Sequence, residues 1–462
     1  MKRIVKKVSK NIFVLWMVCS LLVPNLIVLA DQEVSLVQQP SQWAIEGLNK
    51  SHLYELSTED LFNDFQEYVT GEELSQVIQF LYPQIVEEVS TVEELINTID
   101  KENFVTREEV GNALGTLIQM TQPTLVEGEG KGVDYLITKE ILKGNGKNNL
   151  ALEKNCTREE LLVLASRVYE FVVHETGQAS KGLFWKIADE DSEVYVLGSI
   201  HMADRRIYPF SKNIEKAYEM SQYLAVEASI IEDQEGIQYM QAKAFYDDEN
   251  TFKDNVSAET YEATLEILAM YQIGEAELEQ TGLNKVKPWF MAMFLQSLGL
   301  TEGTAVNATL GVDYYFLSKA LGTKEIIEIE GIKFQVDLFD SFSAEIQEQF
   351  LADTLQGIGS GDEEENISQD VIDYMLDLWK QGDGANLAEL LEQSKATGDE
   401  DEFTQKFWTE RDKNMVDSIV EFLADQEQST YFVVVGAGHV VGETGIIKLL
   451  EEQGYIVEQI VD

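Results

Sequence analysis

Cysteine and histidine are both scarce in this chain of 462 residues, which has two cysteines and four histidines. Cys19 lies in an apolar stretch near the N-terminus, so Cys156 stands alone in the remainder. A mature exported chain with one cysteine has no internal disulfide. The same scarcity excludes zinc sites of the Cys₄ and Cys₂His₂ types.

Positive charge is scarce as well, because 34 Lys and Arg residues stand against 83 Asp and Glu residues, a formal net charge of −49. So acidic a surface repels phosphate backbones, and we expect no nucleic-acid partner. The sequence also lacks the Gly-x-Ser-x-Gly, HExxH and P-loop motifs. It therefore gives no support to an α/β-hydrolase serine enzyme, to a zincin or to a P-loop nucleotide-binding protein.

The first 30 residues have a different composition from the rest of the chain. Five basic residues fall within the first ten positions, and an apolar stretch follows as far as Leu29. Val28 and Ala30 fit the −3 and −1 positions of a cleavage site before Asp31. The pattern predicts a secretory signal peptide over residues 1–30, the alternative being an uncleaved membrane anchor. Few cysteines behind such a signal are typical of a secreted bacterial protein associated with the cell surface or cell wall.

A weak repeat occurs three times in the part of the chain that follows. The copies begin "VTGEELSQVIQFLY" at Val69, "VTREEVGNALGTLI" at Val105 and "CTREELLVLASRVY" at Cys156. Each has an apolar residue, then Thr, then Glu three positions further on, then an amphipathic pattern. This is a capping box at the start of a helix. Cys156 stands where the other copies have Val, so we interpret it as a small buried hydrophobic residue.

These copies resemble the Thr-Arg-Ala-Glu signature of S-layer homology repeats over residues 40–175. The resemblance implies an all-α module that holds exported proteins to cell-wall polysaccharide, with Arg107, Arg158 and Trp43 as wall-binding residues. The first copy departs from the pattern because Gly71 replaces the arginine. Glu also stands where the signature has Ala. A degenerate module that only positions the next domain is the alternative.

A polar, Gly-containing stretch at 174–182 predicts a domain boundary, and strands alternate with helices over residues 182–462. This alternation indicates an α/β sheet covered by helices, with large helical insertions. The first two strands are expected to form a hairpin. The expected strands are 183–189, 193–198, 223–229, 324–331, 431–439 and 455–461.

Polar residues stand at or just after the ends of four of these strands, and in an open α/β sheet the carboxyl ends of the strands line a ligand crevice. They are His201, Glu227, Glu330 and His439. Gly198 and Gly436 precede the two histidines with the same Gly-x-x-His spacing, and we expect each to let the backbone turn and approach a ligand closely. Two imidazoles and one carboxylate suffice to hold a divalent metal. Each residue also has a plainer interpretation, as a hydrogen-bonded loop histidine or a solvent-facing acid.

The stretches "GLFWKIADEDSEVYVLGSIHMAD", "GVDYYFLSKALGTKEIIEIEGIKFQVDLF", "ERDKNMVDSI" and "FVVVGAGHVVGETGIIKLLEEQGYIV" resemble the TraB/GumN family, also called the Tiki family. They occur in the family's order and span residues 182–462. The family's pattern is two Gly-x-x-His motifs and one Glu, which correspond here to His201, His439 and Glu227. Its members include pheromone-shutdown proteins and metal-dependent peptidases that use manganese or cobalt.

The same resemblance implies supporting roles for Asp313, Glu330 and Arg411. Asp313 would orient a ligand, and Arg411 would either stabilise an oxyanion or pair with a buried acid. We therefore predict an exported metal-dependent peptidase with a peptide or protein substrate. In it His201, Glu227 and His439 hold Mn²⁺ or Co²⁺ more favourably than Zn²⁺, and the three residues and Arg411 are catalytic. The alternative is a non-catalytic surface protein that binds or sequesters a peptide or pheromone.

Overall fold

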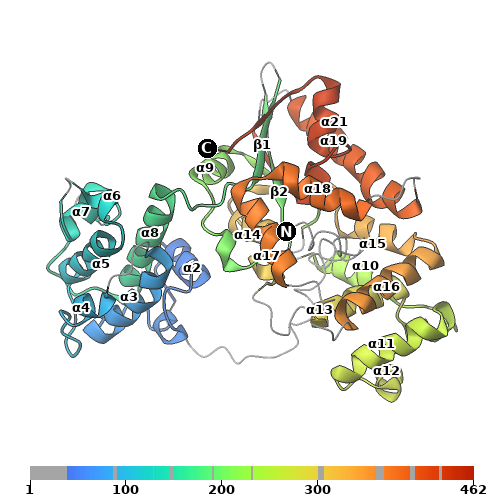
Figure 1. Ribbon diagram of the computed structural model, residues 1–462, viewed down its shortest axis with the longest axis horizontal. Coiled ribbons are helices and arrows are strands. Elements are labelled where there is room, and N and C mark those ends of the chain that lie inside the picture. Colours follow the sequence, from blue (N-terminus) through green and yellow to red (C-terminus); the bar gives the residue numbers. More distant parts are fainter. Residues whose placement is uncertain are drawn as a thin grey trace. The chain divides into compact units, whose positions relative to one another are not determined.

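The computed structural model describes residues 39–86, 91–127, 130–144, 149–189, 192–229, 231, 233–299, 306–359, 369–395, 401–425 and 429–461. The predicted signal peptide and its cleavage site lie outside these ranges. The chain divides into two compact units between Ala179 and Ser180 (Figure 1). This division falls within the polar stretch 174–182, although the helix before it continues to Glu175. None of the described helices combines the length and the apolar character needed to cross a membrane.

The N-terminal unit is built from helices whose apolar faces meet in one core. They are α2 (Ile45–Leu53), α3 (Gly71–Ile85), α4 (Val92–Ile96), α5 (Arg107–Thr121), α6 (Pro123–Val126), α7 (Val133–Thr138) and α8 (Arg158–Glu175). The three predicted capping boxes are confirmed at the starts of α3, α5 and α8. In each, the threonine oxygen accepts a hydrogen bond from the backbone N–H of the Glu three residues on, as Thr157 does from Glu160.

The three repeats close into a ring through their backbones. Val69 N–H donates to the Cys156 carbonyl at 2.8 Å, Cys156 N–H to Val105 at 2.9 Å, and Val105 N–H to Val69 at 3.0 Å. Cys156 is 2% exposed, which confirms that it is a small buried residue. Burial also raises the pKa of its thiol. The repeats in the sequence therefore form a closed structural unit.

Arginines of the repeats join neighbouring copies across the ring. Arg158 pairs with Glu73 at 2.7 Å, and Arg107 pairs with Glu160 at 2.5 Å. Gly71 holds the third equivalent position and has no side chain with which to reach Glu109. A Cβ on Gly71 would lie 2.0 Å from the carbonyl oxygen of Asp100. The backbone around the first copy therefore leaves no room for the missing arginine.

The C-terminal unit contains a six-stranded mixed sheet in the order β4-β3-β5-β2-β1-β6. Its strands are β1 (Leu183–Ala188), β2 (Glu193–Ser199), β3 (Tyr223–Val226), β4 (Glu325–Glu328), β5 (Tyr431–Gly436) and β6 (Ile456–Gln459). Strands β4, β3, β5 and β2 are parallel, and β1 is antiparallel to β2 and β6. The predicted α/β class and the predicted hairpin are both confirmed.

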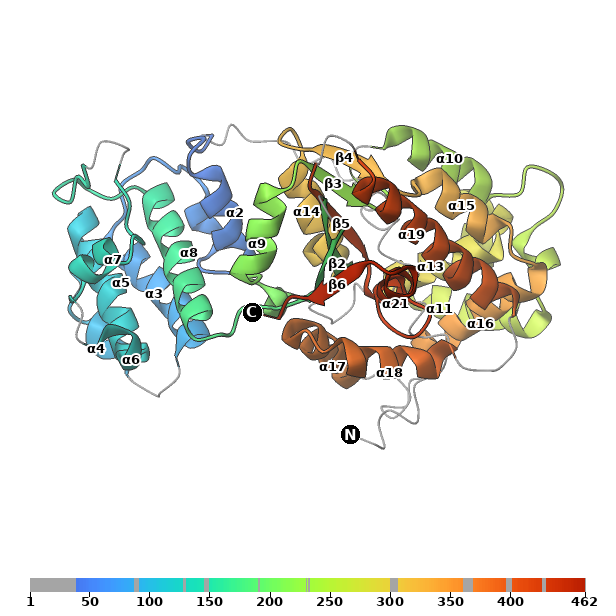
Figure 2. The ribbon, with the colours of Figure 1, turned by 90° about the horizontal axis from the view of Figure 1, so that it is seen from above.

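Helices cover both faces of this sheet, with α9 and α14 on one face and α19 and α21 on the other (Figure 2). The expected insertions are helical, and they precede and follow β4. The helices of the unit are α9 (Lys212–Met220), α10 (Gln234–Ala244), α11 (Ala258–Met270), α12 (Glu275–Thr281), α13 (Pro288–Gly299), α14 (Val312–Ala320), α15 (Ile332–Asp340), α16 (Ala344–Gly359), α17 (Gln369–Gln381), α18 (Gly384–Lys395), α19 (Glu410–Leu423), α20 (Ala437–Val440) and α21 (Ile446–Gln453).

Candidate functional site

The parallel strands bring their carboxyl ends to the same edge of the sheet. Ser199 at the end of β2 is in register with Gly436 at the end of β5, and Val226 at the end of β3 is in register with Val434. The β-branched and apolar residues of β5 are all buried, which anchors this edge in the core. The residues that directly follow the three strands are therefore held close to one another.

Three of the predicted site residues meet around Gly436. A Cβ on this glycine would lie 3.2 Å from Glu227 Oε1, 3.3 Å from His201 Nε2 and 3.5 Å from His439 Cδ2. The side chains belong to residues that are 4%, 5% and 3% exposed, respectively. Any residue larger than glycine at position 436 would fill the space between them. The convergence predicted from the polar strand ends is thus present in the fold.

The two motif glycines act through close packing rather than through a turn. Gly198 lies inside β2, and a Cβ there would be 3.1 Å from the Ala437 Cα. Gly436 has a φ of −51°, a value open to any residue. His439 lies on the one-turn helix α20 and not on a loop. The expectation that each glycine delivers its histidine onto a tight loop holds for His201, which follows β2 outside any helix. It does not hold for His439, which lies on α20.

His201 is held by a carboxylate from α14. Asp313 Oδ1 lies 2.8 Å from His201 Nδ1 and also accepts a hydrogen bond of 2.6 Å from the Ser199 hydroxyl. Burial lowers the pKa of His201, but the nearby Asp313 and Glu227 carboxylates raise it above its ordinary value overall. The Nδ1 contact leaves Nε2 as the ring atom near Gly436.

His439 is held in the same manner from the opposite face of the sheet. Asp412 Oδ1, on α19, lies 2.5 Å from His439 Nδ1, and Asp412 is fully buried. The sequence reasoning missed Asp412, although it directly follows Arg411 in the family motif "ERDKNM". The Trp408 and Phe407 rings lie 4.9 and 6.1 Å from the His439 ring, centroid to centroid.

Arg411 joins the two buried glutamates. Its Nη2 donates to Glu227 Oε2 at 2.7 Å, and its Nε donates to Glu330 Oε1 at 2.7 Å. Gln335, also missed from the sequence, donates to both carboxylates at 3.3 and 3.1 Å. The Gly436 N–H donates to Glu227 Oε1 at 2.6 Å. Of the two roles considered for Arg411, the structure shows the pairing with buried acids.

These contacts leave the site with more negative than positive charge. Four buried carboxylates, those of Glu227, Glu330, Asp313 and Asp412, face one guanidinium. Burial raises the pKa of Glu330, while Arg411 opposes the shift. Such an excess in a region of low dielectric favours a cation or bound protons. Among the described residues, however, no group of three His, Cys, Asp or Glu side chains has the arrangement of a ready metal site.

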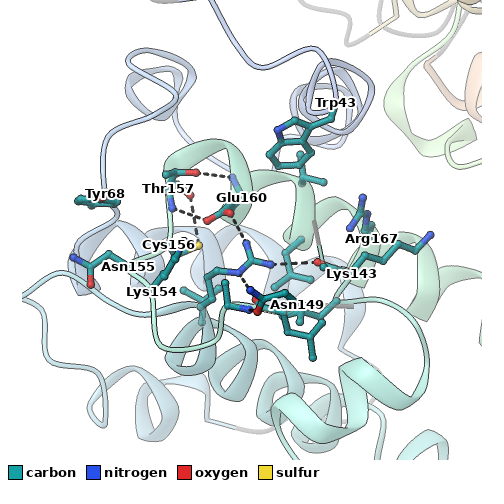
Figure 3. A pocket seen from close by; sticks show the side chains of 18 residues that line it. Trp43, Tyr68, Lys143, Asn149, Lys154, Asn155, Cys156, Thr157, Glu160 and Arg167 are labelled. Carbon is teal, nitrogen blue, oxygen red and sulfur yellow. Dashed lines mark hydrogen bonds and ion pairs between the residues drawn. The ribbon is translucent and has the colours of Figure 1, made fainter. Parts of the chain in front are cut away.

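The residues predicted to bind the cell wall lie in the N-terminal unit, two of them beside a cavity of 1130 Å³ (Figure 3). Trp43 is 55% exposed at its rim, and Arg107 lines it. Arg158 is not among the lining residues, because its guanidinium is directed at Glu73. The structure therefore separates Arg158 from the other two.

The profile of the TraB/PrgY/gumN family matches residues 183–459. No curated protein and no solved structure matches the chain. Residues 40–175 lie outside the family match, so their likeness to S-layer homology repeats stays a prediction. The matched region takes in the sheet, both Gly-x-x-His motifs and both histidine–aspartate pairs, and it covers more than half of the chain. The protein belongs to the TraB/PrgY/gumN family.

Proposed function

We propose that the C-terminal unit is a metal-dependent peptidase or a related hydrolase that acts at the cell surface. The observation that carries the proposal is the convergence of His201 Nε2, Glu227 Oε1 and the His439 ring around Gly436. Each histidine is oriented by a carboxylate at Nδ1, as metal-binding histidines commonly are. Two histidines with a purely structural role would not both need an aspartate at Nδ1 that turns the rest of the ring towards Gly436.

The donor types fit a divalent ion, although they do not form a closed site as they stand. Two imidazoles and one carboxylate oxygen are suitable ligands, and the excess of buried carboxylates favours a cation. The preference for Mn²⁺ or Co²⁺ over Zn²⁺ is what the family resemblance implies, since two imidazoles and one carboxylate would also suit Zn²⁺. When bound, such an ion lowers the pKa of a coordinated water and polarises a carbonyl group.

The residues of the chain would fix the reacting groups. Glu227 Oε1 is the carboxylate oxygen nearest the space beside Gly436, so Glu227 either holds the ion or takes the proton of the attacking water. Arg411 orients Glu227 through the bond to Oε2. Backbone N–H groups of the Gly-x-x-His segments would stabilise the oxyanion, a contribution of about 3 kcal/mol for a well-placed donor.

Histidine substitutions test this proposal. His201→Ala and His439→Ala should each abolish Mn²⁺- or Co²⁺-dependent cleavage of a peptide library, while a chelator abolishes it in the wild type. His52→Ala is the matched control, because His52 lies in the N-terminal unit with a 54% exposed side chain. Cleavage that persists in both site variants would refute the proposal. Stoichiometric peptide binding without turnover would support the alternative, a protein that binds or sequesters a peptide or pheromone.

Export is part of the proposal, and it rests on the signal pattern of residues 1–30. The mature protein should then begin near Asp31, which N-terminal sequencing of protein from the native host would establish. An intact Met1 terminus in a membrane fraction would instead indicate an anchor.

We further propose that the N-terminal unit binds cell-wall polysaccharide, because its cavity concentrates positive charge on a very acidic protein. Arg107, Lys143, Lys154 and Arg167 line it, and Glu160 is the acid among the lining residues (Figure 3). An exposed aromatic ring at the rim, such as Trp43, is suited to stacking on a sugar.

Sedimentation with purified cell walls tests this binding. Trp43→Ala should reduce the bound fraction, and Arg158→Ala should not if the cavity is the binding site, because Arg158 does not line it. Deletion of residues 40–175 should release the protein into the medium without loss of activity. Equal retention of the deleted form would exclude anchoring by this unit.

A further inference from the structure

We propose that Asp412 is a positioning residue that fixes the tautomer and orientation of His439, so that Nε2 carries the lone pair of this ring. The use of a free Nε2 lone pair rests on the proposed function, whereas the contact between Asp412 and His439 does not depend on it. Asp412 is 0% exposed and its Oδ1 lies 2.5 Å from His439 Nδ1. Neither the sequence motifs nor the family match assigns a role to this residue.

The chemistry of the pair sets the tautomer. A neutral imidazole has one N–H and one lone pair, and an ionised carboxylate can only accept hydrogen bonds. The proton of neutral His439 must therefore lie on Nδ1, which leaves the lone pair on Nε2. An asparagine at the same position can also donate through its amide nitrogen. It would then stabilise the opposite tautomer, with the proton on Nε2 and no lone pair for a ligand.

The surroundings of His439 preserve this arrangement. The π-helix η9 (Thr404–Thr409) leads directly into α19, and it places the Phe407 and Trp408 rings beside the imidazole. His439, Trp408 and Asp412 are each at most 3% exposed. A hydrogen bond shielded from water in this way is stronger than an exposed one. The ring is thus held by packing as well as by the carboxylate.

The His201–Asp313 pair is an independent copy of the same device. Asp313 comes from α14 and Asp412 from α19, helices on opposite faces of the sheet (Figure 2). Both carboxylates nevertheless contact the Nδ1 atom of a Gly-x-x-His histidine. Because two different helices supply the same contact, we infer that the histidines require it, so that Nε2 of each ring keeps its lone pair.

Nuclear magnetic resonance of ¹⁵N-labelled imidazoles in the full chain tests the tautomer without any metal or substrate. The chain has four histidines, so four ring systems are expected, and the one lost in His439→Ala assigns the relevant signals. At a mildly alkaline pH, wild-type His439 should show the Nδ1–H tautomer. In Asp412→Asn the signal should change to the Nε2–H tautomer or to a mixture, while His201 keeps its own. Asp412→Glu, which retains a carboxylate, should restore the wild-type form.

Calorimetric titration with Mn²⁺ supplies a second measurement. Asp412→Asn should bind the ion about 10- to 100-fold more weakly than the wild type. Asp417→Asn is the matched control, since Asp417 is exposed on the same helix and should leave the affinity unchanged.

The outcomes separate the two proposals. A wild type that binds no metal would contradict the proposed function and leave the tautomer measurement intact. Wild-type His439 in the Nε2–H form, or no change of tautomer in Asp412→Asn, would overturn the role of Asp412. If Asp412→Asn does not fold, the wild-type spectrum alone still decides.

Discussion

The two units of the protein reach ordered structures by different routes. In the N-terminal unit, each repeat contains the capping box that begins its helix. The two residues of the box at the start of α8, Thr157 and Glu160, are only three positions apart. In the C-terminal unit, Glu227 and Arg411 are in contact although 184 residues separate them. Local sequence patterns are therefore sufficient to predict the helices of the repeats. A buried polar site instead depends on residues that are far apart in the sequence, and no local pattern shows that they are in contact.

Removal of Arg411 would break the site more severely than any change in the repeats. Arg411→Met leaves Glu227 and Glu330 buried without their shared cation, which should lower the free energy of unfolding by about 3–5 kcal/mol. Urea denaturation of the full chain measures the effect. Lys413→Met, at an exposed position on the same helix, is the control and should change stability by less than about 0.5 kcal/mol. Equal stability of the two variants would mean that the buried ion pairs do not form.

Restoration of the missing arginine in the first repeat tests whether the local pattern also decides stability in the N-terminal unit. By sequence alone, Gly71→Arg should complete the ring of ion pairs. Because a Cβ there would lie 2.0 Å from the Asp100 carbonyl oxygen, we expect the variant to lose about 1–3 kcal/mol instead. Thermal unfolding of the variant measures this loss. A gain in stability would show that the first copy can relax and that the local pattern decides.

A buried acid in the C-terminal unit should make stability depend on pH. Burial is the larger of two opposing effects on Asp353 and raises its pKa from 3.8 to about 6; a hydrogen bond from Gln349 acts in the opposite direction and is weaker. The folded state then binds the proton more tightly than the unfolded state, so stability falls as the pH rises from about 4 to above 6. Asp353→Asn should therefore stabilise the protein at pH 7, by an amount on the order of 1–2 kcal/mol because the group keeps some contact with water. The difference should vanish below pH 4, which denaturation at several pH values would test.

The capping threonines should give the smallest effects and the most uniform ones. Thr106→Ala and Thr157→Ala each remove one bond to a helix N–H and should lower stability by about 1 kcal/mol. Thr→Ser variants keep the oxygen and should be nearly neutral. If the losses differ strongly between the two copies, the repeats are not equivalent in energy, and the contrast with the C-terminal unit weakens.

Part of the candidate site could be predicted from the sequence because the end of a buried strand can be recognised from the apolar run before it. His201, Glu227 and His439 each follow an apolar, β-branched run, and parallel strands bring such ends together. Asp412 and Gln335 carry no such mark. They lie on helices among many other acidic and polar residues, and their importance depends on which helix face packs over the sheet.

The sequence by itself determined the elements: the three capped helices, the hairpin and the strands of the α/β sheet. These depend on hydrogen bonds and apolar periodicity within short segments, so neighbouring residues are sufficient evidence. Only the tertiary structure decided that Arg411 pairs with two glutamates, that Asp412 holds His439, and that Gly71 has no room for a side chain. Each of these depends on the desolvation of a charge or on contact with a distant backbone atom, and both arise only when the chain is packed.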